Sequence, residues 1–168
     1  ISRLNADKRS VGRKEPVPTF EQAAKLCRGR IGLYIDHKAA AVSEVVATLD
    51  RTRFGAKVVV YGGTDTLKEY RRLRPNLAIM PDHPDTAREM DQMVAELHPE
   101  TMDGHMTDWT KEQVEAAHRH GATVWMDVMG ASDCETGWRQ AVEMGADALQ
   151  TDCPDRLIAL LKGKGLHN

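Results

Sequence analysis

Short apolar runs of strand length alternate with longer helical stretches along almost the whole chain. The runs begin at intervals of about 20 to 26 residues, which is the spacing of compact strand–helix units. Because strands that alternate with helices pair in parallel through crossover connections, the pattern predicts an α/β fold. The runs are Ile31–Ile35, Lys57–Tyr61, Leu77–Met80, Thr101–Met106, Ala122–Met129 and Ala146–Gln150.

Helix signals fill the segments between these runs. Thr19 with Gln22, and Thr110 with Gln113, have the spacing of a capping box, in which side chains and backbone N–H groups satisfy each other at a helix N-terminus. Asp152 is interpreted as the cap of the last helix. The predicted helices are a first one between Thr19 and Gly29, then Ala40–Leu49, Asp65–Leu73, Asp85–Leu97, Thr110–His120, Gly137–Met144 and Pro154–Leu161.

Length and composition exclude several classes of protein. The 168 residues suffice for one domain, and a net charge of −2 with interspersed signs gives no basic face for nucleic acid. No apolar run approaches the roughly 20 residues that span a membrane. The three cysteines, Cys27, Cys134 and Cys153, have no CxxC spacing, so we interpret them as unpaired thiols and infer no compartment from them.

The number of strands decides between two architectures. About six strand–helix units are visible, whereas a closed barrel of this kind has eight. An open, doubly wound sheet is the alternative, but its Gly-rich phosphate turn after the first strand is missing. We therefore expect an incomplete TIM-type (β/α)8 barrel without its first two strands. On this interpretation residues 1–168 form a single, N-terminally truncated domain, and Ile1–Val17 is an irregular lead-in.

One predicted strand ends in two opposite charges. Because side chains alternate along a strand, Tyr34, Asp36 and Lys38 share one face of the segment Arg30–Lys38. His37 points to the other face and is expected to be structural. Charged side chains at the C-terminal end of a barrel strand lie where active sites form. An ion pair that merely closes the top of the core is the alternative interpretation.

Three motifs follow one another along the chain. The run VPTFEQA from Val17, followed by GLYIDHK from Gly32, resembles the glycerophosphodiester phosphodiesterase family, namely its VPT-[LF]-E-E helix and its strand that ends in acidic-x-Lys. GADALQTDCP from Gly145 is similar to its last strand, G-x-D-[GA]-[IL]-x-T-D-x-P, and GATVWMDV from Gly121 is similar to its seventh. The motifs occur in order over Val17–Leu161, so the resemblance implies a TIM barrel.

The resemblance also implies metal-dependent hydrolysis of a small-molecule glycerophosphodiester to an alcohol and glycerol 3-phosphate. If the roles of the family's acidic-x-Lys pair apply to this chain, Asp36 binds a divalent cation, Mg²⁺ or Ca²⁺. The same resemblance implies that Lys38 binds the phosphodiester, so that Lys38 is both a catalytic and a substrate-binding residue. The family more often has Glu at the first position, so Asp36 keeps the carboxylate with a shorter reach. A hard cation and an ammonium both stabilise charge on phosphoryl oxygens.

The family's other catalytic motifs have no counterpart in this chain. They are a His-Arg pair on the first strand, an acidic-x-acidic pair on the second, and a second catalytic histidine. No histidine precedes His37, and Ile1–Lys14 holds no matching carboxylate pair. Since one acid/base group commonly contributes about 10²- to 10⁴-fold to a rate, we expect the 168-residue chain alone to be nearly inactive.

Two further residues are candidates for substrate binding. Thr123, Trp125 and Asp127 share one strand face by alternation. If that face points inward, Trp125 lines the glycerol side of the pocket and Asp127 bonds a hydroxyl; packing of Trp125 inside the barrel is the alternative. His83 and His105 follow predicted strands, but turns are the simpler interpretation of both segments.

A second class of function stays open, a non-catalytic βα domain that binds a phosphorylated ligand or a partner chain. An incomplete barrel leaves sheet edges at the strands near Ile31 and Ala146. Exposed edges pair with other chains, so such a chain is expected to self-associate, to misfold or to depend on a partner. A strand ending in His-Arg-Gly and an acidic-x-acidic motif in the coding sequence upstream of Ile1 would favour the enzyme.

Overall fold

The computed structural model describes residues 17–55 and 57–167, so most of the predicted lead-in lies outside the described residues. Strands and helices alternate throughout the described part. The elements are α1 (Phe20–Cys27), β1 (Leu33–Asp36), α2 (Val42–Arg51), β2 (Val58–Tyr61), α3 (Thr64–Leu73), β3 (Ala78–Met80), α4 (Ala87–Leu97), β4 (Thr101–Met102), α5 (Lys111–Arg119), β5 (Thr123–Asp127), a short 3-10 turn η1 (Gly130–Ser132), α6 (Glu135–Met144), β6 (Ala148–Gln150) and α7 (Pro154–Gly163).

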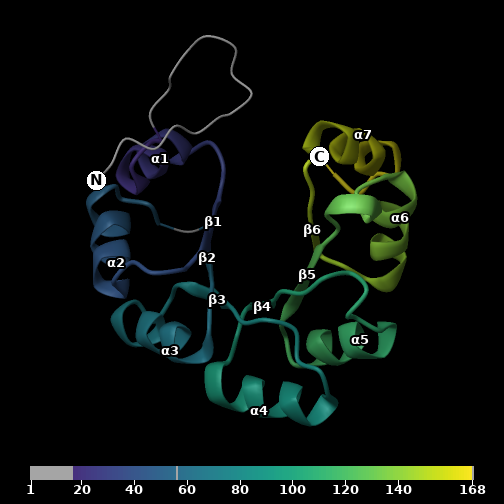
Figure 1. Ribbon diagram of the computed structural model, residues 1–168, viewed down its shortest axis with the longest axis horizontal. Coiled ribbons are helices and arrows are strands. Elements are labelled where there is room, and N and C mark those ends of the chain that lie inside the picture. Colours follow the sequence, from purple (N-terminus) through teal and green to yellow (C-terminus); the bar gives the residue numbers. More distant parts are fainter. Residues whose placement is uncertain (1–16, 56, 168) are drawn as a thin grey trace.

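The strands pair in parallel and in chain order. β1, β2 and β3 form one sheet, and β4, β5 and β6 form a second. The two sheets meet where the Asp103 N–H donates to the Pro81 carbonyl at 2.9 Å. Figure 1 shows the strands following one another along the inside of an arc, with the helices outside it and the two ends of the arc at β1 and β6. The predicted α/β fold with parallel strands is confirmed.

This strand order rules out the doubly wound alternative for the described residues. A doubly wound sheet reverses its strand order and carries helices on both faces, whereas here the order is sequential and the helices lie outside the arc (Figure 1). The strand predicted at Thr101–Met106 is shorter than expected. A Cβ atom on Gly104 would lie 2.7 Å from atoms of both His83 and Trp109, so a larger residue would clash there. Beyond this position, pairing with β5 resumes in the same register at a bridge between His105 and Asp127.

The core lies between the strands and the surrounding helices. One buried cluster joins β1–β3 to α1–α3, and a second joins β4–β6 to α4–α7. Tyr70 and Trp138 are the largest fully buried side chains of the two clusters. Leu33 and Ile35 of β1 pack against the first cluster, so the outward face of β1 is the apolar one. The opposite faces of the strands line the inside of the arc.

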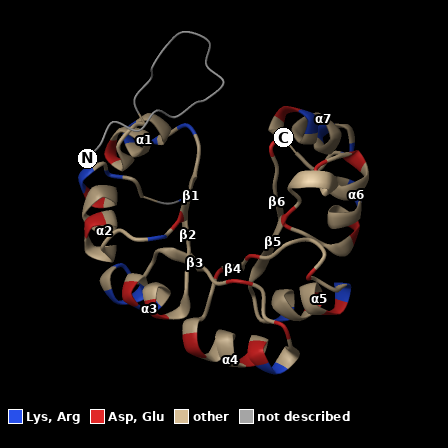
Figure 2. Cartoon of the chain, in the orientation of Figure 1, with Lys and Arg blue, Asp and Glu red and all other residues tan. Residues whose placement is uncertain are grey.

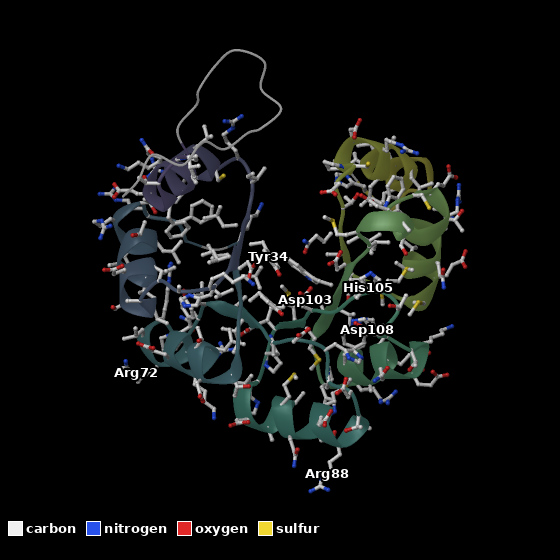
Figure 3. The ribbon with its side chains drawn as sticks, viewed as in Figure 1. Tyr34, Arg72, Arg88, Asp103, His105 and Asp108 are labelled. Atoms are coloured by element: carbon white, nitrogen blue, oxygen red, sulfur yellow. The ribbon has the colours of Figure 1, made fainter. Side chains whose placement is uncertain are left out.

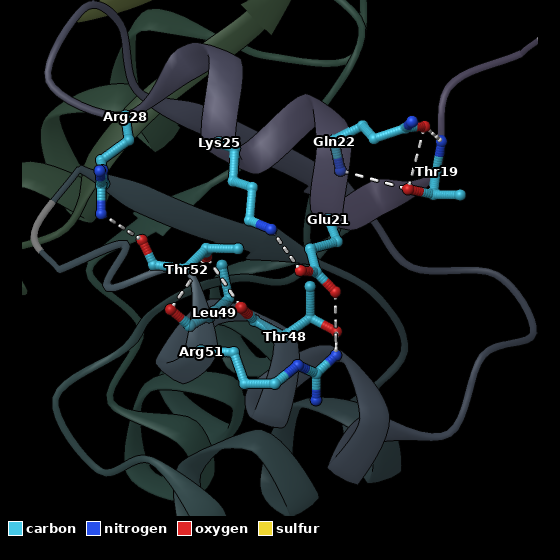
Figure 4. A network of polar contacts seen from close by, with 9 residues as sticks. All are labelled: Thr19, Glu21, Gln22, Lys25, Arg28, Thr48, Leu49, Arg51 and Thr52. Carbon is cyan, nitrogen blue, oxygen red and sulfur yellow. Dashed lines mark hydrogen bonds and ion pairs between the residues drawn. The ribbon is translucent and has the colours of Figure 1, made fainter.

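Polar contacts hold α1 against α2 (Figure 4). The predicted capping box at Thr19 and Gln22 is present, with the Gln22 N–H donating to Thr19 Oγ1 at 3.2 Å. Glu21 accepts from Lys25 at 2.6 Å and lies 3.6 Å from Arg51 of α2. The pKa of Glu21 is lowered by Lys25 and, less strongly, by Arg51. These contacts fix α1 beside the edge strand β1.

A second polar network links the two sheets. Arg71 of α3 contacts both carboxylate oxygens of Glu100, at 3.0 and 2.9 Å, and also donates to the His98 carbonyl at 3.0 Å. Glu100 accepts from the Ile79 N–H of β3 at 3.0 Å. Although partial burial alone would raise it, the pKa of Glu100 lies below its usual value because Arg71 and this N–H bond the charged form. The network connects α3, β3 and the start of β4.

Asp133 ties the loop before α6 to the loop before α7. Its carboxylate accepts from Trp138 Nε1 at 2.8 Å, from the Asp152 N–H at 2.7 Å and from the Thr151 hydroxyl. The interpretation of Asp152 as a helix cap is wrong, because Cys153 holds the N-cap position of α7 without a side-chain cap. Asp152 instead contributes its backbone N–H to Asp133. The TDCP motif therefore serves to join two loops at the C-terminal ends of β5 and β6.

Candidate active site

The charged pair at the end of β1 lies on the inner face of the arc. Tyr34 and Asp36 are exposed along this face, whereas Leu33 and Ile35 are half-buried on the other. Lys38 Nζ lies 2.7 Å from Asp36 Oδ1. Alternation along β1 thus brings the acid and the amine together at the strand's C-terminal end, as the sequence predicts.

This ion pair is open to solvent. The side chains of Lys38 and Asp36 are 72% and 46% exposed, so the pair does not close the top of a core. The Lys38 ammonium also lies 5.8 Å from the centre of the Tyr61 ring, at the end of β2. An exposed ammonium and carboxylate remain available to a ligand, and an exposed pair contributes little to stability.

Tyr34 reaches across the inside of the arc. Its ring lies 6.4 Å from that of Tyr61 and 6.4 Å from that of Trp125 on β5, and is nearly parallel to both. Its hydroxyl donates to Asp103 Oδ2 at 3.4 Å. Figure 3 shows Tyr34 and Asp103 close together on the inner side of the arc, with Arg72 on the outside. Tyr34 therefore connects β1 with strands of the second sheet.

The inner face of β5 carries the residues expected there. Thr123, Trp125 and Asp127 alternate with the buried Val124 and Met126. Trp125 is half-buried and packs against Tyr34, so both interpretations of this residue, packing and pocket lining, agree with its position. Asp127 Oδ1 accepts from the Met129 N–H at 2.9 Å.

Acidic residues stand at or just after the C-terminal ends of β3, β4 and β5 (Figure 2). Burial, together with the neighbouring Asp82 and Asp127, raises the pKa of Asp103 to about 6. Hydrogen bonds from the Gly104 N–H and the Tyr34 hydroxyl act in the opposite direction and lower this pKa. Burial and the nearby carboxylates also hold the pKa of Tyr34 above its ordinary value. Buried like charges disfavour ionisation, so the charged form of Asp103 is disfavoured at this position.

Replacing Asp103 with asparagine is expected to stabilise the fold at pH 8. Because the pKa of Asp103 is about 6 in the folded chain and about 3.9 when unfolded, the folded state binds more protons between these values. Stability therefore falls as the pH rises through this window. Asparagine removes that loss, so D103N should melt above the parent at pH 8 and close to it at pH 4.

Melting temperatures at both pH values check this prediction, with D108N as the matched control. Asp108 lies in the same loop but is exposed. A D103N variant that is no more stable than D108N at pH 8, or that shows the same gain at pH 4, would contradict it.

Two cavities lie beside these residues. One of about 370 Å³ is lined by Asp36, His37 and Lys38 together with residues of α2. Another of about 280 Å³ is lined by Tyr34, Asp103, Trp125 and neighbouring residues of β5 and β6. Of these two cavities, only the first is lined by Lys38.

The described residues supply one carboxylate, Asp36, of the expected metal site. Across residues 17–55 and 57–167, no three His, Cys, Asp or Glu side chains are grouped so that they could hold a metal ion. A divalent cation prefers six or more oxygen ligands. These residues alone therefore do not form the expected cation site.

The histidines near the strand ends have mainly structural contacts. His37 Nδ1 lies 2.8 Å from the Tyr70 hydroxyl on the outward side of β1, which agrees with its predicted structural role. The side chain of His83 is 9% exposed and packs edge-on against Trp109 at 4.6 Å. His105 Nδ1 lies 2.7 Å from the Thr107 hydroxyl.

Sequence reasoning missed Tyr61 and Asp103. Both lie at or just after the C-terminal end of a strand, and that position was the available signal. Asp103 was overlooked because the predicted strand continued through it to Met106. The contact between Tyr34 and Asp103 joins residues far apart in the sequence, and no local pattern predicts it.

Comparison with known proteins finds its matches among solved structures. No protein-family model matches the sequence, and a search of curated proteins finds no match either. A glycerophosphodiester phosphodiesterase from Parabacteroides distasonis superposes with a TM-score of 0.75 at 19% identity, over 90% of this chain and 67% of that one. One from Agrobacterium tumefaciens gives 0.72 at 19% identity, over 86% and 62%.

An Oleispira antarctica phosphodiesterase, solved with the product sn-glycerol-3-phosphate, gives a TM-score of 0.75 at 15% identity, over 89% of this chain and 63% of that one. The chain has the fold of glycerophosphodiester phosphodiesterases. At these identities the likeness establishes the fold, and it confirms the similarity that the motifs indicate. Across seven matched structures this chain spans 56–68% of the other protein's length.

Within the described residues, no helix is long and apolar enough to cross a membrane.

Proposed function

We propose that this chain forms the phosphate-binding part of a glycerophosphodiester phosphodiesterase, which hydrolyses its substrate to an alcohol and glycerol 3-phosphate. The observation that carries the proposal is the paired Asp36 and Lys38 at the inner C-terminal end of β1, on the fold of these phosphodiesterases. Lys38 binds a non-bridging phosphoryl oxygen. An ammonium at this position stabilises the negative charge that grows on the phosphoryl group during cleavage.

Asp36 is proposed as one ligand of a divalent cation, Mg²⁺ or Ca²⁺. Such an ion would polarise the phosphoryl group and offset its charge. The remaining ligands would come from outside the described residues, since these hold no group of three suitable side chains. Trp125 and Asp127 are proposed to contact the substrate from the inner face of β5, with Asp127 accepting from a hydroxyl group.

The arc is proposed to be the larger part of a TIM-type barrel. Within the described residues β1 pairs only with β2, and β6 pairs only with β5. The large apolar side chains that remain exposed border these two edges, on or beside α1, β1 and α7: Val17, Leu26, Ile31, Tyr34, Ile158 and Leu166. Further strand–helix units between β6 and β1 would bury this surface and pair both edges.

Hydrolysis of glycerophosphocholine tests the proposal. The assay uses the longest natural polypeptide that contains these residues, with Mg²⁺ or Ca²⁺ and with a chelator as control. Activity is expected with the cation and not with the chelator. Asp36→Ala should lower the rate at least about 100-fold, because loss of the cation would remove several kcal/mol of transition-state stabilisation. The 168-residue chain alone is expected to be nearly inactive, for want of the acid/base histidines.

Two results would count against this assignment. Unchanged turnover in Asp36→Ala would remove Asp36 from the site. Rapid hydrolysis by the 168-residue chain alone would show that its own residues supply the proton transfers.

The same exposed edges favour a second candidate, a βα domain that depends on a partner chain. On that proposal the apolar side chains around β1 and β6 bind a second copy or another protein. Concentration-dependent association of the chain, together with no hydrolysis by the longer polypeptide, would favour it over the enzyme.

A further inference from the structure

A separate cavity, also of about 280 Å³, lies between the loops that lead into β1 and β2. It is therefore at the N-terminal ends of these strands, opposite to the end that carries Lys38. Four positively charged side chains line it, those of Arg28, Arg30, Arg53 and Lys57. We propose that this cavity is an anion site that binds a phosphate group carrying two or more negative charges. The proposal goes beyond the phosphodiesterase function and does not depend on it.

Backbone contacts hold the two loops side by side. The Leu33 N–H donates to the Lys57 carbonyl at 2.8 Å, and a Cβ atom on Gly32 would lie only 3.0 Å from that carbonyl oxygen. Arg28 Nη1 donates to the Thr52 carbonyl at 3.2 Å (Figure 4). The fold thus brings together cations that stand far apart in the sequence, which is why the interspersed charges of the chain gave no sign of this cluster.

The positive charge of the cavity has no carboxylate to balance it. No Asp or Glu is among the described residues that line it, and none of the four cations forms an ion pair within the described part of the chain. Carboxylates of the neighbouring helices have other partners: Asp50 lies 3.8 Å from Arg74, and Glu21 accepts from Lys25. A bound anion would relieve the repulsion among the four cations.

The ends of α1 and α2 account for only part of this charge. Both helices end just before the loops that form the cavity, and cations beside a helix C-terminus are stabilised by its partial negative charge. Two helix ends supply about one negative charge in total, at about half a charge each. Four full positive charges line the cavity, so a substantial excess remains for a ligand.

Two of the cations stand at positions where the backbone favours glycine. Arg53 and Lys57 have φ angles of 52° and 72°, in the left-handed region. Arg53 directly follows Thr52, the C-cap of α2, at a position where glycine commonly ends a helix. Charged side chains at both positions make the loop less stable than glycine would. Such strain is typical of binding sites, and here both strained residues direct a charge to the same cavity.

The chemistry of the lining selects a phosphate group. Guanidinium groups present paired N–H donors that match two phosphate oxygens at once, and three of the four cations are arginines. The volume is below the roughly 300 to 1,000 Å³ of pockets for drug-sized ligands, so a small anion fits best. Ile31, which also lines the cavity, is 63% exposed and could contact an apolar group attached to the phosphate. A soluble diphosphate and the headgroup of an anionic lipid share this chemistry.

Isothermal titration with inorganic pyrophosphate tests the site. It uses the longest natural polypeptide that contains these residues, at low ionic strength and without divalent cations. Saturable binding is expected, and it should weaken as the ionic strength rises. Arg53→Gly should weaken it about tenfold, the effect of losing a charged hydrogen-bond donor. The same variant should melt no lower than the parent, because glycine suits a φ of 52°.

Two variants control for net charge and for the other end of the strands. Arg88→Ala removes an exposed cation from α4, on the outside of the arc (Figure 3), and Lys38→Ala removes the ammonium after β1. Each should change the affinity for pyrophosphate less than about twofold. Absence of pyrophosphate binding would overturn the proposal. So would equal losses in Arg53→Gly and Arg88→Ala, or binding that is lost in Lys38→Ala.

Vesicles distinguish the two sources of the phosphate group. The polypeptide is sedimented with phosphatidylcholine vesicles that either contain or lack phosphatidic acid, whose headgroup is a phosphate monoester. Sedimentation that requires both phosphatidic acid and Arg53 would assign the cavity to a lipid headgroup. Pyrophosphate binding without such sedimentation would assign it to a soluble ligand. Hydrolysis of glycerophosphocholine, present or absent, has no part in either result, so this site and the proposed function can fail separately.

Discussion

Replacing Lys38 with alanine is expected to weaken the binding of glycerol 3-phosphate by about 10- to 100-fold, the range for a lost charge-assisted hydrogen bond to phosphate. Lys38 is the ammonium that stands at the inner end of β1, paired with Asp36 and 72% exposed. Because it is exposed, its removal should leave the melting temperature nearly unchanged. Isothermal titration at low ionic strength, with Mg²⁺ present, measures the affinity.

Lys111→Ala provides the matched control for charge. Lys111 is exposed at the start of α5, on the outer ring of helices. Its substitution removes one positive charge without touching the strand ends, so affinity should change less than about twofold. Equal losses in the two variants would mean that Lys38 acts through net charge and does not contact the phosphate.

Truncating Trp138 is expected to cause the largest loss of stability. Its side chain is 1% exposed in the cluster that joins β4–β6 to α4–α7. Its Nε1–H donates to Asp133 at 2.8 Å, and the Arg156 guanidinium lies 5.5 Å from the ring. Trp138→Ala should lower the free energy of unfolding by about 3–5 kcal/mol, as for other buried aromatic truncations.

Urea unfolding measures this loss, and Trp125→Ala is the control. Trp125 is half-buried on the inner face of β5, so its truncation should cost less than half as much. If Trp138→Ala lost no more stability than Trp125→Ala, the buried cluster around α6 would not be the main support of the second sheet.

The alternation of strands and helices was predictable because each element has a local signal. The capping box at Thr110 and Gln113 marks the start of α5, as predicted, and Gly145 takes a left-handed conformation that ends α6. Alternation along β1 and β5 correctly predicted which residues share a face, Tyr34 with Asp36 and Trp125 with Asp127. These features depend on residues only a few positions apart.

The features that were missed depend on tertiary contacts. The interruption of β4 before His105 lies where Gly104 closely approaches His83 and Trp109, and pairing with β5 resumes at the bridge between His105 and Asp127. The TDCP loop was misassigned because Asp133, from another loop, takes the Asp152 N–H. Asp103 became a candidate only once Tyr34 was found beside it. Local patterns predict neither the partner of a loop nor the environment of a carboxylate.

The location of bound glycerol 3-phosphate tests the central claim most directly. Backbone amide signals of the 168-residue chain can be followed by NMR during a titration with this compound and Mg²⁺. The phosphate-binding account predicts that the largest changes fall at the ends of β1 and β2, on His37, Lys38 and Gly62, and that they vanish in Lys38→Ala. Changes confined to the outer helices, or changes that persist in that variant, would contradict it.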